Sequence, residues 1–346
     1  VSAMTELPGL GRIRFRASEI RQERTGVHAL VVIGYDNGRG PVVLDYDTMN
    51  TGKRADRNPL AGSCWEQLGE LERAAYPKAR MQAELSSFCS HLWECWQGRY
   101  ESKELAGSLA IAAPPYILKP YVIEGAGTII FSHPKKGKSY LAMIISAVID
   151  TGLQSFWPTT GGKSYYINLE RSEASVARRL AAVNRCLGLP PDRTMLMLQA
   201  RGKGMSEIWH AVKRDIKDYG VTVVFVDSLS QAGIVGSLVE DTAGRKIIDM
   251  LNSLGVAWVA LAHTSWASEE HTYGTIMFRA GADLEVQLLS QQRAGGTLGV
   301  GLQVVVANDI ASGPGSGLCI LALDFNDTGL IAIRKARPHE FPEIEG

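Results

Sequence analysis

The chain has 346 residues and carries 36 basic and 36 acidic side chains. With 45% hydrophobic and 21% charged residues it lies near the globular average, which excludes a disordered, collagen-like or coiled-coil chain. Its length suffices for one large domain or two ordinary ones. Because the net charge is zero, any polyanion must be bound by a local patch, a loop or an assembled ring.

The first 104 residues are expected to form a small α+β domain, to which the sequence assigns no role. Two apolar, β-branched runs flank residues 36–38, Asp-Asn-Gly, which is the turn chemistry of a β-hairpin. Before them, three arginines alternate with Ile13 and Phe15, so a strand there would place all three on one face. That face is either simply solvated or in contact with phosphate. The arginines are Arg12, Arg14 and Arg16.

A proline-containing linker over residues 105–120 is expected to separate this domain from a second one over residues 121–346. The linker is poor in charge and follows a charged, helix-like segment, residues 81–103. Its prolines cannot continue that helix, so we expect the helix to end before them.

From residue 128 onward, strands alternate with helices, a pattern that predicts an α/β fold with a mostly parallel sheet covered on both faces. From Asp283 strand follows strand, which predicts antiparallel strands at the C-terminal end of the sheet. The predicted strands are 128–132, 164–169, 195–199, 222–227 and 256–262, and the predicted helices are 137–150, 173–187, 206–219 and 241–254.

The segment between the first strand and the first helix of the second domain has the design of a phosphate-binding loop. Backbone N–H groups of such a loop point inward, and the dipole of the following helix favours an anion. Lys138 would add a mobile positive charge for the β and γ phosphates, and the Ser139 hydroxyl is placed for magnesium. The candidate nucleotide-binding residues are Ser132, His133, Pro134, Lys135, Lys136, Gly137, Lys138, Ser139 and Tyr140.

This segment matches the P-loop pattern G-x-x-x-x-G-K-[ST] except at its first position, which is Ser132. Glycine tolerates backbone conformations that serine does not, so the departure raises a question about the turn. The strand before the loop and the helix after it favour the P-loop interpretation.

Three strand ends add polar groups suited to phosphoryl transfer. Asp227 ends an apolar strand and either coordinates magnesium or is a helix cap or turn residue. Glu170 ends the strand after the P-loop helix, and because parallel strands end on one rim, it is the expected general base. The alternative general base is Glu173, in the next helix. His263 closes a further strand and is either a satisfied core histidine or a sensor of the γ phosphate.

The motifs SHPKKGKS, NLE, FVDS and LAHTS, in this order, resemble those of the RecA-like P-loop ATPases. The likeness is to the phage and plasmid branch that contains the hexameric RepA-type replicative helicases, and it extends over residues 114–335. It implies a RecA-like ATPase domain over residues 121–346 that uses ATP and Mg²⁺ and assembles as a homo-oligomer, a hexameric ring. The roles it implies agree with those above for Lys138, Ser139, Glu170, Asp227 and His263.

The resemblance also implies arginines around the nucleotide. Arg179 matches one that such helicases direct toward the nucleotide, although Arg178 could substitute because adjacent helix positions differ by about 100°. Relatives usually complete the site with an arginine or lysine from the adjacent subunit. Here Asp283 stands at the expected place, and Arg279, four residues earlier, could serve from the same helix face. A second basic position is occupied by Asn308.

Single-stranded DNA is the implied partner, held by the loops after the Asp227 and His263 strands. These loops, residues 228–240 and 265–274, contain no lysine or arginine, and the second contains two glutamates. Contact would therefore depend on hydrogen bonding and on stacking by Trp266, or on basic residues elsewhere.

Two functions from different classes fit these features. The leading one is a ring-forming, ATP-driven DNA helicase or translocase of phage or plasmid replication. The alternative is a non-motor protein whose nucleotide-gated assembly loads or recruits a replication or recombination partner. The missing trans-acting cations and the acidic loop favour this alternative.

No membrane partner is expected, because the longest apolar runs fall short of the roughly 20 residues that a spanning helix needs. The five cysteines are scattered, as in a reduced intracellular protein. We therefore expect a cytoplasmic protein of a bacterium or of a phage-infected host cell.

Overall fold

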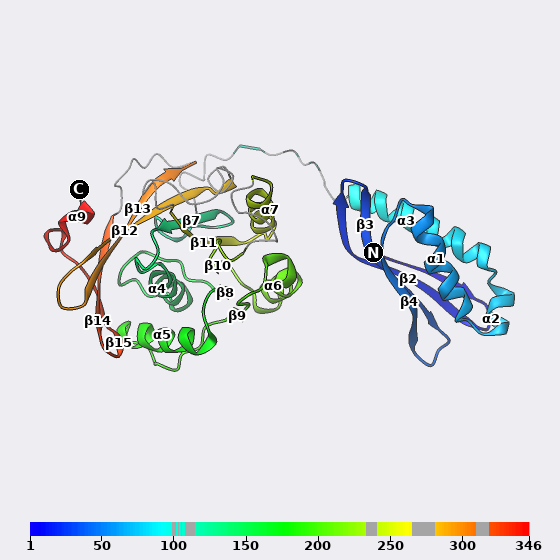
Figure 1. Ribbon diagram of the computed structural model, residues 1–346, viewed down its shortest axis with the longest axis horizontal. Helices are drawn as coiled ribbons and strands as arrows, with labels where there is room; N and C mark the ends of the chain where they lie inside the picture. Colours follow the sequence, from blue (N-terminus) through cyan, green and yellow to red (C-terminus); the bar gives the residue numbers. More distant parts are fainter. Residues whose placement is uncertain are drawn as a thin grey trace. The chain divides into compact units, whose positions relative to one another are not determined.

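The computed structural model describes residues 1–98, 102, 104, 106–107, 115–232, 241–264, 281–308 and 318–345. Contacts divide the chain into two compact units, Val1–Gly107 (unit 1) and Ser108–Gly346 (unit 2) (Figure 1). Each unit has a hydrophobic core of its own. None of the helices in the described ranges combines the length and the apolar character needed to cross a bilayer.

Unit 1, in its described part, is a four-stranded antiparallel sheet with helices packed on one face. The alternation in β2 turns Ile13 and Phe15 toward the helices and the arginines toward the other face, as the sequence predicts. The predicted hairpin is also confirmed, as β3 and β4. The elements are β1 (Ser2–Leu7), β2 (Gly11–Glu23), β3 (Gly26–Asp36), β4 (Pro41–Asn50), α1 (Arg54–Glu66), α2 (Glu70–Ala75) and α3 (Lys78–Gln97).

Among the described residues, unit 2 forms a nine-stranded sheet in the order β15-β14-β13-β12-β7-β11-β10-β8-β9. The strands from β12 to β9 are parallel to one another, whereas β12 to β15 pair antiparallel. The strands are β7 (Gly127–Ser132), β8 (Ser164–Asn168), β9 (Met197–Gln199), β10 (Val223–Asp227), β11 (Ala257–His263), β12 (Leu284–Gln292), β13 (Thr297–Ala307), β14 (Cys319–Asn326) and β15 (Gly329–Lys335). The small hairpin of β5 (Tyr116–Leu118) and β6 (Val122–Ile123) precedes them.

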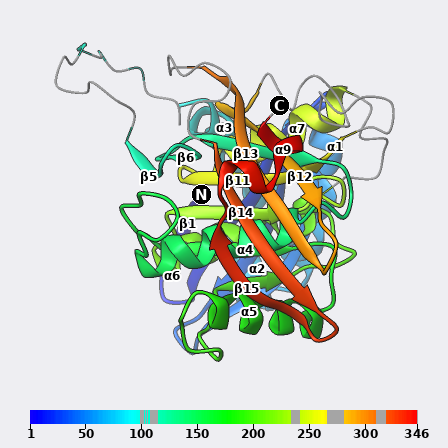
Figure 2. The same cartoon turned by 90° about the vertical axis from the view of Figure 1, so that its left-hand side faces the viewer.

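Helices cover both faces of this sheet. The apolar sides of α4 (Lys138–Thr151) and α5 (Glu173–Cys186) pack on one face, and those of α6 (Met205–Tyr219) and α7 (Asp241–Asn252) pack on the other (Figure 1). Figure 2 shows β12 to β15 side by side, with α5 beside β15. The chain ends in η1 (Pro338–Glu340) and α9 (Pro342–Glu345).

This architecture confirms the α/β fold with a mostly parallel sheet and antiparallel C-terminal strands. The parallel direction of the strands explains why their polar ends come together. The strands β7, β8, β10 and β11 are all parallel, so their carboxyl ends lie at the same rim of the sheet.

The first residue of β7 packs against a buried tryptophan, and this contact allows a test of the fold. A Cβ at Gly127 would lie 2.1 Å from Cζ2 of Trp258, whose Nε1 donates a hydrogen bond to Asn252. We expect Gly127→Ala to destabilise the protein by about 1–3 kcal/mol, because the anchored indole cannot move away. The measurement is urea-induced unfolding followed by circular dichroism. At Gly107, the control for the same change, a Cβ would meet nothing within 4 Å; equal midpoints for the two variants would contradict the expectation.

Candidate functional site

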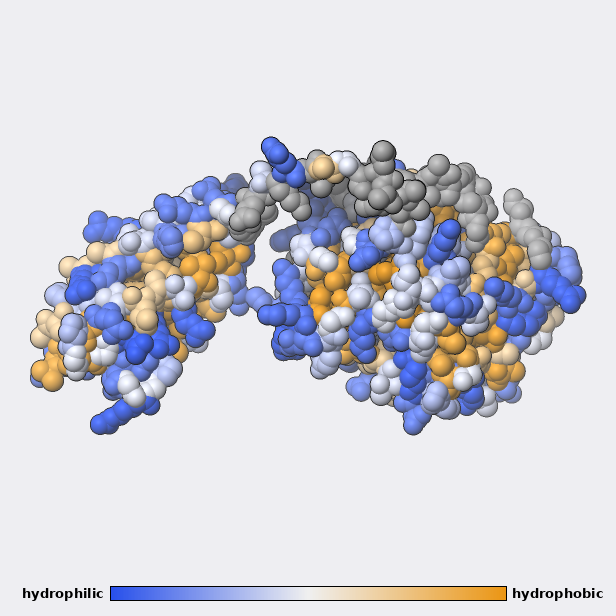
Figure 3. All heavy atoms as spheres, turned by 180° about the vertical axis from the view of Figure 1, so that it is seen from behind, coloured by the Kyte–Doolittle hydropathy of each residue, from blue (hydrophilic) through white to orange (hydrophobic). Residues whose placement is uncertain are grey.

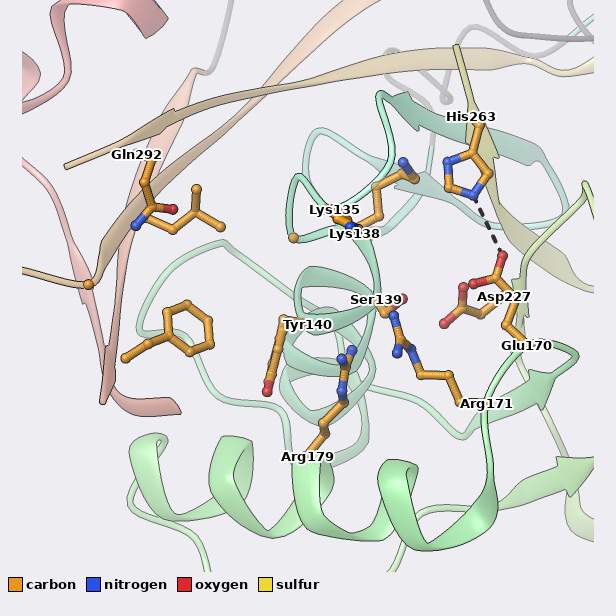
Figure 4. Close-up of a pocket in the computed structure, with 14 residues that line it drawn as sticks. Lys135, Lys138, Ser139, Tyr140, Glu170, Arg171, Arg179, Asp227, His263 and Gln292 are labelled. Carbon is orange, nitrogen blue, oxygen red and sulfur yellow. Dashed lines mark ion pairs between the residues drawn. The ribbon is translucent and has the colours of Figure 1, made fainter. Parts of the chain in front are cut away.

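A cleft of about 440 Å³ opens at the rim where β7, β8, β10 and β11 end (Figure 4). Described residues from six separate parts of unit 2 line it. Nine of them were candidates from the sequence: Lys135, Gly137, Lys138, Ser139, Tyr140, Glu170, Arg179, Asp227 and His263. Five were not: Arg171, Gln292, Gly296, Leu298 and Phe325.

The loop between β7 and α4 has no need of glycine at its first position. Ser132 is the last residue of β7 and pairs with His263 in the sheet. Positive φ angles occur later in the loop, at Lys135 (65°) and at Gly137 (96°), where α4 begins. The departure from the P-loop pattern at residue 132 therefore introduces no backbone strain.

Lys138 is buried rather than mobile, contrary to expectation. The residue is only 6% exposed. Its Nζ donates hydrogen bonds to the Ser132 carbonyl (2.7 Å), the Ser132 hydroxyl (3.1 Å) and the His133 carbonyl (2.9 Å). Burial lowers the pKa of Lys138 to about 8, although Glu170 and Asp227 act in the opposite direction. The ammonium thus lies at the centre of the loop, where an anion would meet it.

Asp227 is also buried, with 3% exposure, and its carboxylate accepts a hydrogen bond of 2.7 Å from the Tyr166 hydroxyl. Burial raises the pKa of Asp227, while hydrogen bonds from Tyr166 and Ser139 lower it. Asp227 does not cap α7, which begins at Asp241. A carboxylate and a hydroxyl in contact are hard oxygen ligands of the kind that Mg²⁺ binds together with phosphate oxygens, so these two residues fit a magnesium ion.

Glu170 lies beside Ser228 and His263. The Ser228 hydroxyl donates to Glu170 Oε1, and His263 Nε2 is 3.6 Å from the same oxygen (Figure 4). Hydrogen bonds from His263 and Ser228 outweigh burial and lower the pKa of Glu170 to about 2. His263 is no satisfied core histidine, because its buried Nδ1 has no hydrogen-bond partner within the described ranges.

The alternatives to the cleft residues are exposed to solvent. Glu173 and Arg178 are both exposed in α5, whereas Arg179 lines the cleft with its guanidinium 4.6 Å from the centre of the Tyr140 ring. Arg279 lies outside the described residues, as do most of the two loops expected to hold DNA.

Three of the predicted loop residues face a different, smaller cleft of about 260 Å³. Ser132, His133 and Lys136 line it together with residues of β12. His133 Nδ1 is 2.8 Å from the Thr264 hydroxyl, which links the loop to the end of β11. Pro134 lies between these residues in the loop and lines neither cleft.

The far end of the main cleft is apolar, and sequence reasoning missed it. Phe325 of β14 meets Tyr140 edge-on at 5.3 Å, and Leu298 of β13 lies beside them in the lining. These strands are distant in the chain, so no local pattern marks them. Arg171 carried one signal that was overlooked: it directly follows Glu170.

Asp283, at the position where relatives carry a trans-acting arginine, has a structural contact instead. Its Oδ2 accepts a hydrogen bond from the Gly127 amide (2.7 Å), and its own amide donates to the Gly127 carbonyl (2.9 Å). Asp283 thus anchors the start of β7 within the same chain.

A comparison with protein families bears on this cleft. Residues 103–269 match a family described as an AAA domain. This is a family of P-loop ATPases, and the fold of unit 2 is that of a RecA-like P-loop ATPase. The matched AAA segment contains the loop, Glu170, Asp227 and His263, and it ends before β12. No curated protein matches the chain.

The lowered pKa of Glu170 makes its contribution to stability dependent on pH. A carboxyl group has a pKa of about 4.3 in an unfolded chain, so this contribution is complete above that value and is lost as the pH falls through about 2. We expect Glu170→Gln to lower the free energy of unfolding by about 1 kcal/mol at pH 7, a value discounted for partial solvent exposure.

Urea titrations from pH 7 to pH 2 measure this difference, which should shrink toward the acid end. Glu173→Gln removes the same charge at an exposed position and is the matched control. A difference between Glu170→Gln and wild type that stays constant with pH would contradict the expected pairing.

Proposed function

We propose that the AAA domain binds and hydrolyses ATP with Mg²⁺, and that the chain is a ring-forming DNA helicase or translocase of phage or plasmid replication. One observation supports the chemistry above all others. The buried cation of Lys138, at the start of α4, and the carboxylates of Glu170 and Asp227, at the ends of two strands, face one cleft.

The cleft suits the two ends of a nucleotide. Its polar end, at the loop and the first turn of α4, offers Lys138 and a helix N-terminus to the phosphates. Its apolar end, with Tyr140, Leu298 and Phe325, offers aromatic and aliphatic surface to a base. Arg179 lies against Tyr140 and can reach the phosphates or the sugar between these ends.

Ser139 and Asp227 would hold magnesium, which when bound supplies positive charge to the oxygens of the phosphoryl group in transfer. Glu170 would orient the attacking water. Its low pKa keeps it ionised at neutral pH, so it acts more as an acceptor that positions water than as a strong base. His263 contacts Glu170 and ends the strand before residues 265–280, and it can report the state of the site to them.

The open face of the sheet in unit 1 is the surface we propose for DNA. Arg16 lies in register with Val32 of β3 and Tyr46 of β4, so arginine and tyrosine share a row across this face. Tyr46 is 65% exposed, and Met4, opposite Arg14, is 53% exposed. Figure 3 shows hydrophilic and hydrophobic surface side by side on unit 1. Such a mixture suits a single strand, whose phosphates pair with arginine and whose bases stack on aromatic rings.

A non-motor role in loading or recruitment is the second candidate. It is favoured by Asp283 and Asn308, which stand where relatives supply cations to a neighbour. Both are bound to their own subunit, since Asn308 donates to the carbonyls of Asp283 and Ala282. In this role ATP would be bound tightly and hydrolysed slowly.

ATP turnover with and without single-stranded DNA separates the two functions. For a motor, we expect DNA to stimulate turnover, and Glu170→Gln to reduce it at least 100-fold while leaving ATP binding intact, because the side chain that positions water is lost. Glu173→Gln is the control and should keep full activity. Tight ATP binding with little turnover and no response to DNA would reject the motor.

The sheet face in unit 1 can be tested by binding. We expect Arg12→Ala combined with Arg16→Ala to weaken binding of single-stranded DNA and to reduce the salt dependence of the binding constant by a slope of about 1.4, which is two phosphate contacts. Fluorescence anisotropy with labelled oligonucleotides at several salt concentrations measures both. The charge-matched control is Arg54→Ala with Arg73→Ala, on the helical side. An equal loss in both double variants would show a nonspecific effect of charge.

A further inference from the structure

We propose that Arg171 binds the terminal phosphate of the nucleotide from within the same subunit. This inference rests on the ATPase function proposed above. Arg171 is not part of the P-loop and is distinct from the strand-end carboxylates and from Arg179 of α5. Three observations carry it: a fixed backbone, a partly exposed side chain whose buried Nε has no hydrogen-bond partner among the described residues, and its place in the cleft.

The backbone of Arg171 is held on both sides. Its amide donates to Asn168 Oδ1 (3.1 Å), and its carbonyl accepts from Asn168 Nδ2 (2.7 Å) and from Gln199 Nε2 (2.8 Å). Asn168 is itself fully buried at the end of β8. The origin of the Arg171 side chain is therefore fixed relative to the rim, as required of a residue that meets a ligand at a set position.

The side chain of Arg171 reaches into the cleft and is left unsatisfied there. Figure 4 shows it extended toward Ser139 and Asp227, on the side of Glu170. Its Nε is buried without a hydrogen-bond partner, and within the described ranges the guanidinium makes no ion pair. A buried N–H donor without an acceptor is unfavourable, so an anion arriving at this position would supply the missing hydrogen bond.

The neighbours of Arg171 indicate which part of the nucleotide it would meet. Its charge acts on both Glu170 and Asp227, the two groups assigned to water and to magnesium. The charge of Arg179 also acts on Asp227, but its guanidinium lies over the Tyr140 ring, toward the apolar end of the cleft. Arg171 therefore lies at the end where the last phosphate would be.

This position has a consequence for assembly. Arginine provides a planar set of donors that suits phosphate oxygens, and relatives obtain such a group from a neighbouring subunit. A cation already present in the same subunit would let this chain distinguish ATP from ADP before it assembles. The adjacent subunit would supply no cation from the position of Asp283.

The test compares the affinities of the intact protein for two nucleotides. Isothermal titration calorimetry with Mg²⁺ and either AMP-PNP or ADP is applied to the wild type, Arg171→Ala, Arg171→Lys and the exposed-site control Arg178→Ala. We expect Arg171→Ala to weaken AMP-PNP binding at least 10-fold and ADP binding less than 3-fold. Arg171→Lys, which keeps the charge, should recover part of the loss, and Arg178→Ala should match the wild type. Sedimentation at the same concentrations reports whether the discrimination exists in the monomer.

Each other outcome overturns the inference in a recognisable way. Equal weakening of both nucleotides in Arg171→Ala and Arg171→Lys would assign Arg171 a structural role, and unchanged affinities would exclude any contact. If the wild type preferred AMP-PNP to ADP only when assembled, the cation that contacts the terminal phosphate would come from a neighbouring subunit. If the wild type bound neither nucleotide, the proposed ATPase function would fail together with this inference. Normal wild-type binding with an unaffected Arg171→Ala would leave the ATPase proposal standing.

Discussion

The hydrogen bonds of the buried Lys138 ammonium are the interaction on which the cleft depends. They join the end of β7 to the start of α4 through acceptors on Ser132 and His133. A cation with so little exposure is stable only where oxygen atoms or anions surround it. The shape of the loop and its preference for an anion are therefore two results of one buried charge, and the lowered pKa of Lys138 reflects the same burial.

The cleft has an excess of positive charge, which reconciles a neutral chain with a polyanionic ligand. Among the described residues, its lining contains four basic residues, Lys135, Lys138, Arg171 and Arg179, and two carboxylates, Glu170 and Asp227. The cations lie where phosphate can reach them. Ser228 and Tyr166 donate hydrogen bonds to the carboxylates of Glu170 and Asp227, and His263 Nε2 lies 3.6 Å from Glu170. Binding a nucleotide here needs no overall field, because these short-range contacts in a partly buried site are only weakly screened.

The two units contribute different physics to the proposed motor. Unit 2 supplies a rigid rim of parallel strands, on which each polar side chain is held by the sheet behind it. Unit 1 supplies an exposed sheet face where arginines alternate with buried apolar residues. Single-stranded nucleic acid is recognised by charge and stacking rather than by a deep pocket, so such a face suits it without a cavity.

Local patterns in the chain were enough to predict the α/β order of elements, the P-loop, and the strand ends at Glu170, Asp227 and His263, because periodicity and strand-end positions are local properties. It could not show that Ser132 replaces glycine without strain, that Lys138 is buried, or that Asp283 binds Gly127, since each depends on packing between distant segments. Only the tertiary structure placed Phe325 and Leu298 against Tyr140 and left Arg171 unpaired in the cleft. The physical reason is that burial and hydrogen-bond partners arise when strands far apart in sequence become neighbours in one sheet.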